Sequence, residues 1–311
     1  MPVDPNFQAL LDNLAGPDAK DLADLTIGEA RDLEVLMGML ESDKVHVDSV
    51  EDRTIPGPAG EIPIRVYHPD ARGSRPGILL WFHGGGWCLG NLQSGDGPAR
   101  QLASSSGAVV VSVEYRLAPE HPFPAGPEDC WAALNWVANH GSELGGDPAR
   151  IAVGGDSAGG NLAAVVAIKA RDAGAPFICH QLLVYPGTDL TMSHPSIEEN
   201  AEGFLLTKRS MIWFADLYLG PDGDPRDPEA SPIFADDLSG VAPATVITAM
   251  FDPLRDEGEA YAEALRQAGV EARTERYDTM IHGFFSMGSI SPIADHAIND
   301  AAAILREALV D

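Results

Sequence analysis

A serine with small neighbours stands between a predicted strand and a predicted helix. Gly155-Asp156-Ser157-Ala158-Gly159 fits the pattern G-x-S-x-G, with the apolar run IAVGG (151–155) before it and a helical stretch (157–172) after it. A direct turn from strand to helix strains the backbone of the central residue. The flanking residues must have very small side chains, because larger ones would collide across the turn. The turn also places the serine hydroxyl at the positive end of a helix. The pattern alone occurs by chance, but no other serine has this setting. Ser157 is therefore predicted to be a nucleophile that attacks a carboxylic ester.

A glycine-rich segment follows an earlier strand. His83-Gly84-Gly85-Gly86-Trp87 comes directly after the apolar run GILLWF. A serine hydrolase stabilises the negative oxygen of its tetrahedral intermediate with backbone N–H groups, and three glycines free the backbone to aim them. A merely flexible turn is the alternative, which the position at a strand's carboxyl end, upstream of the serine, disfavours. The other donor is expected to be the N–H of Ala158.

The general base should be a histidine that follows the serine in the chain, because this fold orders its catalytic residues as nucleophile, acid and histidine. Four histidines qualify: His180, His194, His282 and His296. His180 lies inside an apolar strand, where a hydrogen-bonded core histidine is expected. His194 lies in an inserted region and His296 on a regular helix face. His282 lies in a loop beside Gly283 and is the predicted base.

Asp252 is the predicted acid. It follows the run ATVITAM-Phe251 at a strand's carboxyl end, where catalytic groups collect in open α/β sheets, and Pro253 stiffens its turn. Its role would be to hold His282 in the correct tautomer and to stabilise the imidazolium. Asp256 and Glu257 are rivals, but they open the next helix and are interpreted as helix N-terminal charges.

Alternating strands and helices should position these residues. Short runs that are apolar throughout are typical of strands buried on both faces, and most are followed by a helical stretch, which predicts a mainly parallel sheet. The runs are 77–83, 108–115, 151–155, 178–186 and 244–250, and the helices 94–105, 128–139, 157–172, 256–267 and 293–309. Residues 46–68 alternate like an antiparallel hairpin, and the polar strand 271–278 is expected near an edge, where it could pair across a homodimer.

Two segments interrupt this pattern. Residues 1–45 are amphipathic and helical, including a run at 27–40, but do not alternate with strands. Residues 188–230 combine Pro, Asp and Gly clusters with the helical run KRSMIWFADLYL and have no companion strand. A connection this long is usually a lid or a functional insertion.

Composition excludes several classes of function. The 311 residues include 20 Lys plus Arg and 47 Asp plus Glu, for a net charge of −27, which disfavours nucleic-acid and peripheral membrane binding. Three irregularly spaced cysteines argue against a disulfide framework or zinc knuckle, and no motif for a nucleotide, dinucleotide or metal cofactor is present. Without a signal peptide or a long apolar stretch, the expected location is the cytoplasm.

The chain resembles the hormone-sensitive-lipase-type esterases, also called family IV bacterial esterases. The resemblance covers roughly residues 45–311. It rests on motifs that occur in the family's order: HGGGW (83–87), YRLAPEHPFPA (115–125), GDSAGG (155–160), DPLRDEG (252–258) and HGF (282–284). The GDSAG form is that of the larger subgroup. The resemblance implies the α/β-hydrolase fold, with a catalytic domain at 46–187 and 231–311 and a helical cap built from 1–45 and 188–230.

The resemblance also implies a site and an activity. Ser157, Asp252 and His282 take the triad positions, and Gly85, Gly86 and Ala158 the oxyanion positions. The implied enzyme is a carboxylesterase for short to medium acyl chains that needs no metal or cofactor. The resemblance implies structural roles for Arg116, Glu120 and Asp129. It also implies that the segment 115–125 supports the oxyanion loop, which is the glycine-rich segment 83–87. Candidate substrate contacts are Trp87, where many members have another aromatic residue, and Phe204 and Leu205 in the insertion; packing of the cap is the alternative for the last two.

Three other functions compete with this one. A non-catalytic receptor on the same fold is disfavoured because such receptors lose the histidine, which is kept here. A peptidase, lactonase or amidase is not excluded by the triad. A true lipase is disfavoured because no large apolar interfacial surface is evident.

Overall fold

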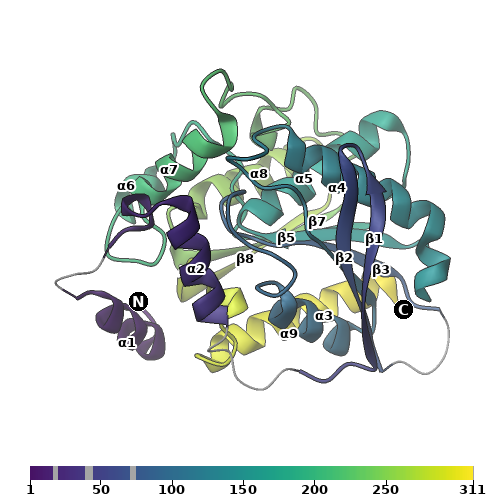
Figure 1. Ribbon diagram of the computed structural model, residues 1–311, viewed down its shortest axis with the longest axis horizontal. Helices are drawn as coiled ribbons and strands as arrows, with labels where there is room; N and C mark the ends of the chain where they lie inside the picture. The colour runs from purple at the N-terminus through teal and green to yellow at the C-terminus, as the bar shows by residue number, and fades with distance from the viewer. Residues whose placement is uncertain (17–19, 39–44, 71–74, 311) are drawn as a thin grey trace.

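The computed structural model describes residues 1–16, 20–38, 45–70 and 75–310. One eight-stranded sheet in this part of the chain has the order β1-β2-β4-β3-β5-β6-β7-β8 (Figure 1). The strands are β1 (Ser49–Gly57), β2 (Gly60–His68), β3 (Ile78–Phe82), β4 (Val109–Val113), β5 (Ile151–Asp156), β6 (His180–Val184), β7 (Ala244–Phe251) and β8 (Ala272–Ile281).

The sheet is mainly parallel. β3 to β8 all run in the same direction, whereas β1 and β2 form an antiparallel hairpin, and β2 joins β4 in antiparallel fashion. The predicted hairpin is therefore confirmed, as is the edge position of the polar strand, which is β8. The parallel order brings the carboxyl ends of β3, β5 and β7 to one edge of the sheet.

Helices cover both faces of the sheet, as the crossover connections require. Figure 1 shows α3 and α9 on one face and α4, α5 and α8 on the other. Their bounds are α3 (Asp96–Ser106), α4 (Ala125–His140), α5 (Ala158–Ala173), α8 (Arg255–Gln267) and α9 (Pro292–Leu309). Each predicted helix is present, and the predicted ends differ from the observed ends by up to three residues.

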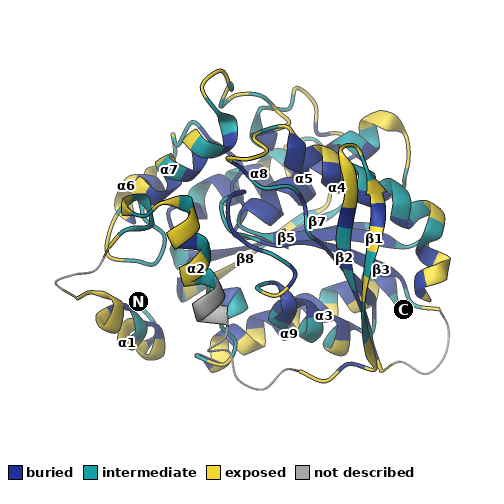
Figure 2. Ribbon diagram, viewed as in Figure 1, coloured by how far each residue is buried: buried dark blue, intermediate teal, exposed yellow. Residues whose placement is uncertain are grey.

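The strands have apolar side chains on both faces because both faces are buried. In β3, Ile78, Leu80 and Phe82 join the core under α4 and α5, while Leu79 and Trp81 join the core under α3 and α9. All five are fully buried, and Figure 2 shows the same burial along the central strands. This two-sided burial explains why the central strands appear in the sequence as unbroken apolar runs.

The inserted and N-terminal segments are helical. They contain α1 (Pro5–Leu14), a short 3₁₀ turn η1 (Leu22–Asp24), α2 (Ile27–Gly38), α6 (Pro195–Glu199) and α7 (Lys208–Leu219). The last two residues of the predicted helix 27–40 lie outside the described residues. α7 coincides with the predicted run, and Thr207 caps it by accepting the N–H of Ser210. The five-residue α6 was not predicted, since it is too short for a periodic pattern.

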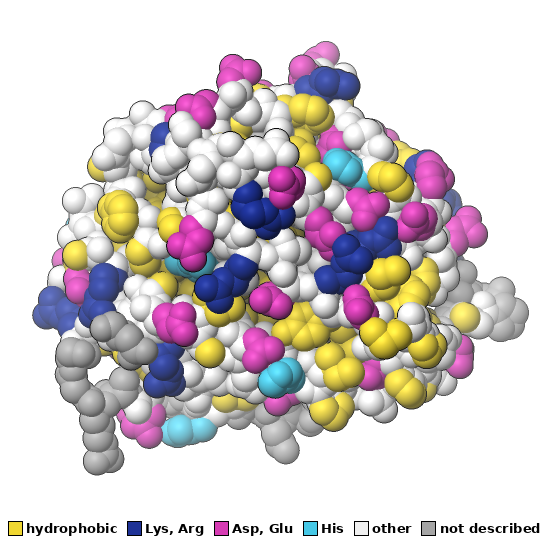
Figure 3. Space-filling model, turned by 180° about the vertical axis from the view of Figure 1, so that it is seen from behind, with side chains coloured by type: hydrophobic (Ala, Val, Ile, Leu, Met, Phe, Trp, Pro, Cys, Tyr) yellow, Lys and Arg dark blue, Asp and Glu magenta, His cyan; other side chains and the backbone are white. Residues whose placement is uncertain are grey.

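The surface carries the charge expected from the composition. On the face shown in Figure 3, acidic and basic side chains are interspersed. No helix in the described ranges is both long and apolar enough to cross a membrane.

Candidate active site

Ser157 lies at the sharp turn between β5 and α5. Its backbone has φ 55° and ψ −118°, a conformation that L-residues rarely adopt, and its N–H donates to the carbonyl of Val184 at 2.9 Å. Gly159, in the first turn of α5, packs directly on β3: a Cβ there would lie 1.9 Å from the carbonyl oxygen of Phe82. The turn is therefore possible only when position 159 has no side chain, as in glycine.

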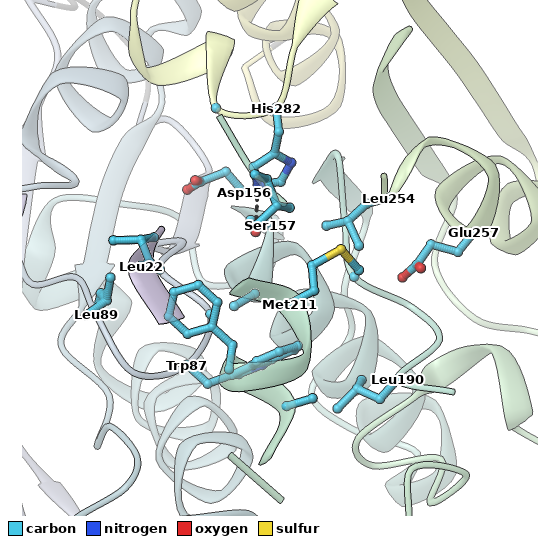
Figure 4. A pocket seen from close by; sticks show the side chains of 18 of the residues that line it. Leu22, Trp87, Leu89, Asp156, Ser157, Leu190, Met211, Leu254, Glu257 and His282 are labelled. Atoms are coloured by element: carbon cyan, nitrogen blue, oxygen red, sulfur yellow. Dashed lines mark hydrogen bonds between the residues drawn. The ribbon is translucent and has the colours of Figure 1, made fainter. Parts of the chain in front are cut away.

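The predicted nucleophile, base and acid lie in one hydrogen-bonded row, of which Figure 4 shows Ser157 and His282. Ser157 Oγ is 3.0 Å from His282 Nε2, and His282 Nδ1 is 2.8 Å from Asp252 Oδ2. These distances let the histidine take a proton from the hydroxyl while the carboxylate fixes the opposite ring nitrogen. The sequence places these residues 95 and 125 positions from the serine, and the parallel sheet brings them together.

Asp252 is held rigidly. It is fully buried, and its second oxygen, Oδ1, accepts the N–H of Leu254 at 2.8 Å. The amide of Asn200, from the insertion, donates to the Asp252 carbonyl at 3.1 Å. Both carboxylate oxygens thus have a partner, so the side chain has one preferred orientation toward His282.

Backbone strain is concentrated around this row. Four non-glycine residues have positive φ in the described part of the chain: Trp87, Ser157, Tyr185 and Met192. Three of them line the cavity described below, and the Tyr185 ring packs against the His282 ring with centroids 4.6 Å apart. Such clustering is typical of functional sites.

The glycine-rich loop faces Ser157. Gly85, Gly86 and Ala158 all line the cavity around the serine. Ala158 is the first residue of α5, so its N–H has no acceptor within the helix. The N–H groups of both glycines likewise have no acceptor among the described residues. A Cβ on Gly86 would lie 2.3 Å from the Phe214 ring, so this position must be glycine.

The loop is supported by buried contacts. Tyr115 Oη donates to the His83 carbonyl at 2.7 Å, and the N–H of Ala118 donates to the Trp87 carbonyl at 2.9 Å. Arg116 in turn pairs with buried Asp129 at 2.8 Å. These contacts agree with the support expected from residues 115–125 and with structural roles for Arg116 and Asp129.

The serine opens into a cavity of about 240 Å³. Its walls are mostly apolar and come from both the sheet body and the inserted segments. The lining residues are Leu22, Gly85, Gly86, Trp87, Leu89, Asp156, Ser157, Ala158, Gly187, Asp189, Leu190, Met192, Leu205, Leu206, Met211, Phe214, Ala215, Leu254, Glu257, His282 and Gly283.

The predicted substrate contacts have mixed outcomes. Trp87 and Leu205 line the cavity. Phe204 does not, which corrects the sequence-based expectation: its ring packs against Phe251 with centroids 5.2 Å apart. Phe204 therefore faces the body of the protein, whereas Leu205 faces the cavity. The sequence of a loop does not reveal which of two neighbouring side chains points inward.

Sequence reasoning also missed Leu22, which lines the cavity from the N-terminal segment. This segment is tied to the insertion, because Asp21 accepts hydrogen bonds from Thr207 at 2.6 Å and from Ser210 at 2.8 Å. α2 reaches the loop beyond the glycines, where Glu34 accepts the N–H of Gly90 at 2.8 Å.

α1 is placed differently. The N–H of Asp4 donates to the Thr279 carbonyl, and its carboxylate accepts from Ser291. Phe7 is fully buried in the core that also contains Phe284. α1 therefore packs on the body of the protein.

The other histidines are accounted for. His180 is buried and hydrogen-bonds Thr245 at 3.0 Å, and burial lowers its pKa to about 4, as suits a neutral core histidine. His194 lies 3.5 Å from Asp189, and His296 is on the surface near Asp300.

Asp256 and Glu257 both lie in the first turn of α8, as expected, but their surroundings differ. Asp256 does lie partly exposed and pairs with Arg255 at 2.7 Å. The Glu257 side chain is instead buried, with 1 % of the residue exposed, and lines the cavity. Burial raises the pKa of this carboxyl well above its usual range.

Asp156, next to the serine, is another carboxyl of the cavity lining whose pKa is raised. Its side chain points away from the Ser157 hydroxyl (Figure 4), and Oδ1 accepts the N–H of Gly84 at 3.0 Å. Burial raises its pKa to about 6, against the opposing effects of His282 and of this hydrogen bond. Asp156 therefore links the strand-to-helix turn at Ser157 to the glycine-rich loop.

No group of three or more His, Cys, Asp or Glu side chains that could hold a metal ion occurs in the residues that the structure describes.

The geometry defines a serine hydrolase built on an α/β sheet, and comparisons with known proteins identify its family. Residues 79–286 match the model of a family described as having the alpha/beta hydrolase fold. The chain is 43 % identical to the carboxylic ester hydrolase LipN of Mycobacterium tuberculosis, over 98 % of this chain and 82 % of the relative. It is 46 % identical to the carboxylesterase NlhH of the same organism, over 84 % and 83 %.

Solved structures agree with this assignment. A thermostable esterase from Pseudomonas putida superposes with a TM-score of 0.95 at 38 % identity, covering 99 % of this chain and 98 % of the other. The chain therefore belongs to the α/β-hydrolase family, in its branch of hormone-sensitive-lipase-like carboxylic ester hydrolases.

The first prediction concerns the packing of the strand-to-helix turn at Ser157 against β3. Gly159→Ala should lower the free energy of unfolding by more than about 4 kcal/mol or abolish soluble expression, because its methyl group would overlap the Phe82 carbonyl. Gly28→Ala is the control: nothing lies within 4 Å of its added Cβ, and α2 gains helix propensity. Urea unfolding measures both. A Gly159→Ala protein as stable as the Gly28→Ala protein would contradict this packing.

The second prediction concerns Asp156. Because its pKa in the folded protein, about 6, lies above the unfolded value of about 4, the folded state binds more protons between these pH values. Stability present below pH 4 is therefore lost as pH rises toward 6. Asp156→Asn has no such titration and avoids this loss. The unfolding free energy of Asp156→Asn minus that of the wild type should therefore rise by about 2 kcal/mol between pH 4 and pH 8.

Urea unfolding at both pH values tests this, with Asp222→Asn as the surface control, since Asp222 is exposed. A difference between Asp156→Asn and the wild type that is the same at pH 4 and pH 8 would contradict the assignment.

Proposed function

We propose that this protein hydrolyses short- to medium-chain carboxylic esters through an acyl-enzyme intermediate on Ser157. The observation that supports this most strongly is the row from Ser157 Oγ to His282 Nε2 at 3.0 Å and from His282 Nδ1 to Asp252 Oδ2 at 2.8 Å. The carboxylic ester hydrolases related to the chain support the same reaction.

In the acylation half, Ser157 Oγ attacks the ester carbonyl while its proton moves to His282 Nε2. The carbonyl oxygen becomes negative and is stabilised by the N–H groups of Gly85, Gly86 and Ala158. His282 then gives the proton to the departing alkoxide, which leaves as the alcohol. Asp252 stabilises the imidazolium in between and remains ionised.

In the deacylation half, a water takes the place of the alcohol. His282 accepts a proton from this water as its oxygen attacks the acyl carbon, and the same N–H groups stabilise the second tetrahedral intermediate. Collapse returns the proton from His282 to Ser157 Oγ and releases the carboxylic acid. The cycle consumes one water and needs no cofactor.

A short to medium acyl chain follows from the bounded cavity. Its space is about 240 Å³, and apolar side chains of the inserted segments form part of its lining. Met211 and Phe214 of α7 and Leu22 of the N-terminal segment contribute to this lining. An amide or lactone fits the same reaction scheme, so both belong in a substrate comparison.

We also propose that residues 188–230, together with η1 and α2, form a cap over the site. Residues 46–187 and 231–311 would then form the catalytic domain. Hydrogen bonds from Thr207 and Ser210 to Asp21 support this division. α1 would belong to the body, given the contacts of Asp4 with Thr279 and Ser291.

We further propose that the enzyme acts in the cytoplasm, which is compatible with the free thiols of Cys88, Cys130 and Cys179. A homodimer could form through β8, the long polar strand at the sheet edge. Light scattering on the purified protein distinguishes this dimer from a monomer.

The third prediction is that Ser157→Ala lowers kcat for p-nitrophenyl butanoate by about 10⁴-fold or more while leaving the fold intact. Ser104→Ala, on the exposed side of α3, is the matched control and should keep full activity. Initial rates and circular dichroism measure the two effects. A folded Ser157→Ala protein with more than a trace of activity would rule out this nucleophile.

The fourth prediction concerns chain length. Across p-nitrophenyl esters, kcat/KM should be highest for acyl chains of about eight carbons or fewer and fall for longer ones, because the cavity has a space of about 240 Å³. Met211→Ala should move the optimum to longer chains by enlarging this space. An optimum above about twelve carbons in the wild type, or faster turnover of matched amides or lactones, would redirect the assignment.

A further inference from the structure

The glycine-rich loop ends in a tight turn that fixes the direction of one proposed oxyanion donor. In a trans peptide, the C=O of one residue and the N–H of the next lie in one plane and point in opposite directions. The Gly85 carbonyl accepts the N–H groups of Cys88 at 3.1 Å and of Leu89 at 2.8 Å. The N–H of Gly86 lies in the same peptide plane and is therefore directed away from the turn. The turn at 85–89 thus determines where this donor points.

The other donor of the loop is oriented by a side chain. His83 Nδ1 lies 2.8 Å from the Gly84 carbonyl and donates to it, since a carbonyl oxygen only accepts. This hydrogen bond fixes the peptide plane that contains the Gly85 N–H. Gly90 packs against the same histidine, because a Cβ at position 90 would lie 2.1 Å from His83 Nδ1. The backbone at 88–90 therefore adjoins the devices that orient both donors.

Helix α2 of the N-terminal segment holds this stretch of backbone at two points. Arg31 Nε donates to the Cys88 carbonyl at 3.0 Å, and Glu34 Oε2 accepts the Gly90 N–H at 2.8 Å. The two side chains are three positions apart, which places them on one face of the helix. One face of α2 thus supplies both a donor and an acceptor to the backbone at 88–90.

The guanidinium of Arg31 is itself fixed by further hydrogen bonds. Nη1 and Nη2 each donate to a carboxylate oxygen of Glu120 at 2.8 Å, and Nη2 also donates to the Ala118 carbonyl at 3.0 Å. The N–H of Ala118 donates in turn to the Trp87 carbonyl at 2.9 Å. A guanidinium bound to both oxygens of a carboxylate has one preferred orientation. Arg31 therefore holds the loop directly at Cys88 and indirectly at Trp87.

We propose that Arg31 and Glu34 are positioning residues of the reaction, which hold the backbone at 88–90 so that the Gly86 N–H points at the developing oxyanion. The proposal rests on the esterase function proposed above and gives the N-terminal segment a part in it. Arg31 and Glu34 are not among the residues that line the cavity, so both act through the backbone of the loop. Removal of one oxyanion donor lowers kcat by about 10²- to 10³-fold, and loss of its positioning should cost part of this effect.

The probes are p-nitrophenyl butanoate and its thiono analogue, in which sulfur replaces the carbonyl oxygen. Sulfur is a weak hydrogen-bond acceptor, so the thiono ester gains little from the oxyanion donors but still needs the row of Ser157, His282 and Asp252. Both esters release p-nitrophenol on acylation, the step that kcat/KM reports. The ratio of kcat/KM for the oxygen ester to that for the thiono ester therefore measures oxyanion stabilisation, and it cancels damage to the row or a loss of folded protein.

Three variants and a control on the same helix complete the test. Arg31→Ala and Glu34→Met each remove a contact and should lower the ratio by about tenfold. Glu34→Gln keeps an acceptor for the Gly90 N–H, so its ratio should stay within about twofold of the wild type. Asp32→Ala is the matched control, since Asp32 is exposed on α2, and it should change neither the ratio nor the activity. Circular dichroism checks that each variant is folded at the assay temperature.

Two results would overturn the proposal. The first is a wild-type ratio in both Arg31→Ala and Glu34→Met, whether or not their activity falls, because the contacts would then not act on the oxyanion donors. The second is a fall for Glu34→Gln as large as that for Glu34→Met, because the charge and not the hydrogen bond would then matter. The two Glu34 variants decide the matter even if Arg31→Ala does not fold. Failure of the esterase function would appear separately, as no hydrolysis of p-nitrophenyl butanoate by the wild type.

Discussion

The close approach between α5 and β3 is the constraint on which the site depends. The strand-to-helix turn at Ser157 exists because Gly159 lets the helix backbone lie against the Phe82 carbonyl. The strained φ of the serine is the geometric consequence, and the hydroxyl then stands at the helix N-terminus above the sheet. The same contact sets the position of β3, and thereby of the glycine-rich loop that β3 leads into. One packing contact thus positions both the proposed nucleophile and the proposed oxyanion donors.

The remaining elements complete the site at the same edge of the sheet. Asp252 follows β7 and His282 follows β8, whereas Ser157 follows β5, so the three side chains come from three strands of one sheet. Asp156 joins the turn to the glycine-rich loop through the Gly84 N–H. Buried carboxyls at Asp156 and Glu257 show that the walls of the site combine low polarity with a few fixed donors and acceptors, the usual composition of a small-molecule site.

The sequence could predict those parts of the fold that local pattern determines. Apolar runs located the central strands, and G-x-S-x-G in its strand–helix setting singled out Ser157, because both signals are short-range. It could not predict that Leu22 lines the cavity, since this depends on docking of a distant segment through Asp21. The orientation of Phe204 and the burial of Glu257 were likewise missed, because neighbouring positions in a loop or helix turn face different surroundings.

Mass spectrometry after labelling with diethyl p-nitrophenyl phosphate tests the central claim most directly. This organophosphate transfers its phosphoryl group to an activated serine and releases p-nitrophenol. The account predicts loss of esterase activity in step with one diethylphosphoryl adduct per chain, located by peptide mapping on Ser157. An adduct on another residue that accompanies the loss of activity, or complete inhibition with Ser157 unmodified, would contradict it.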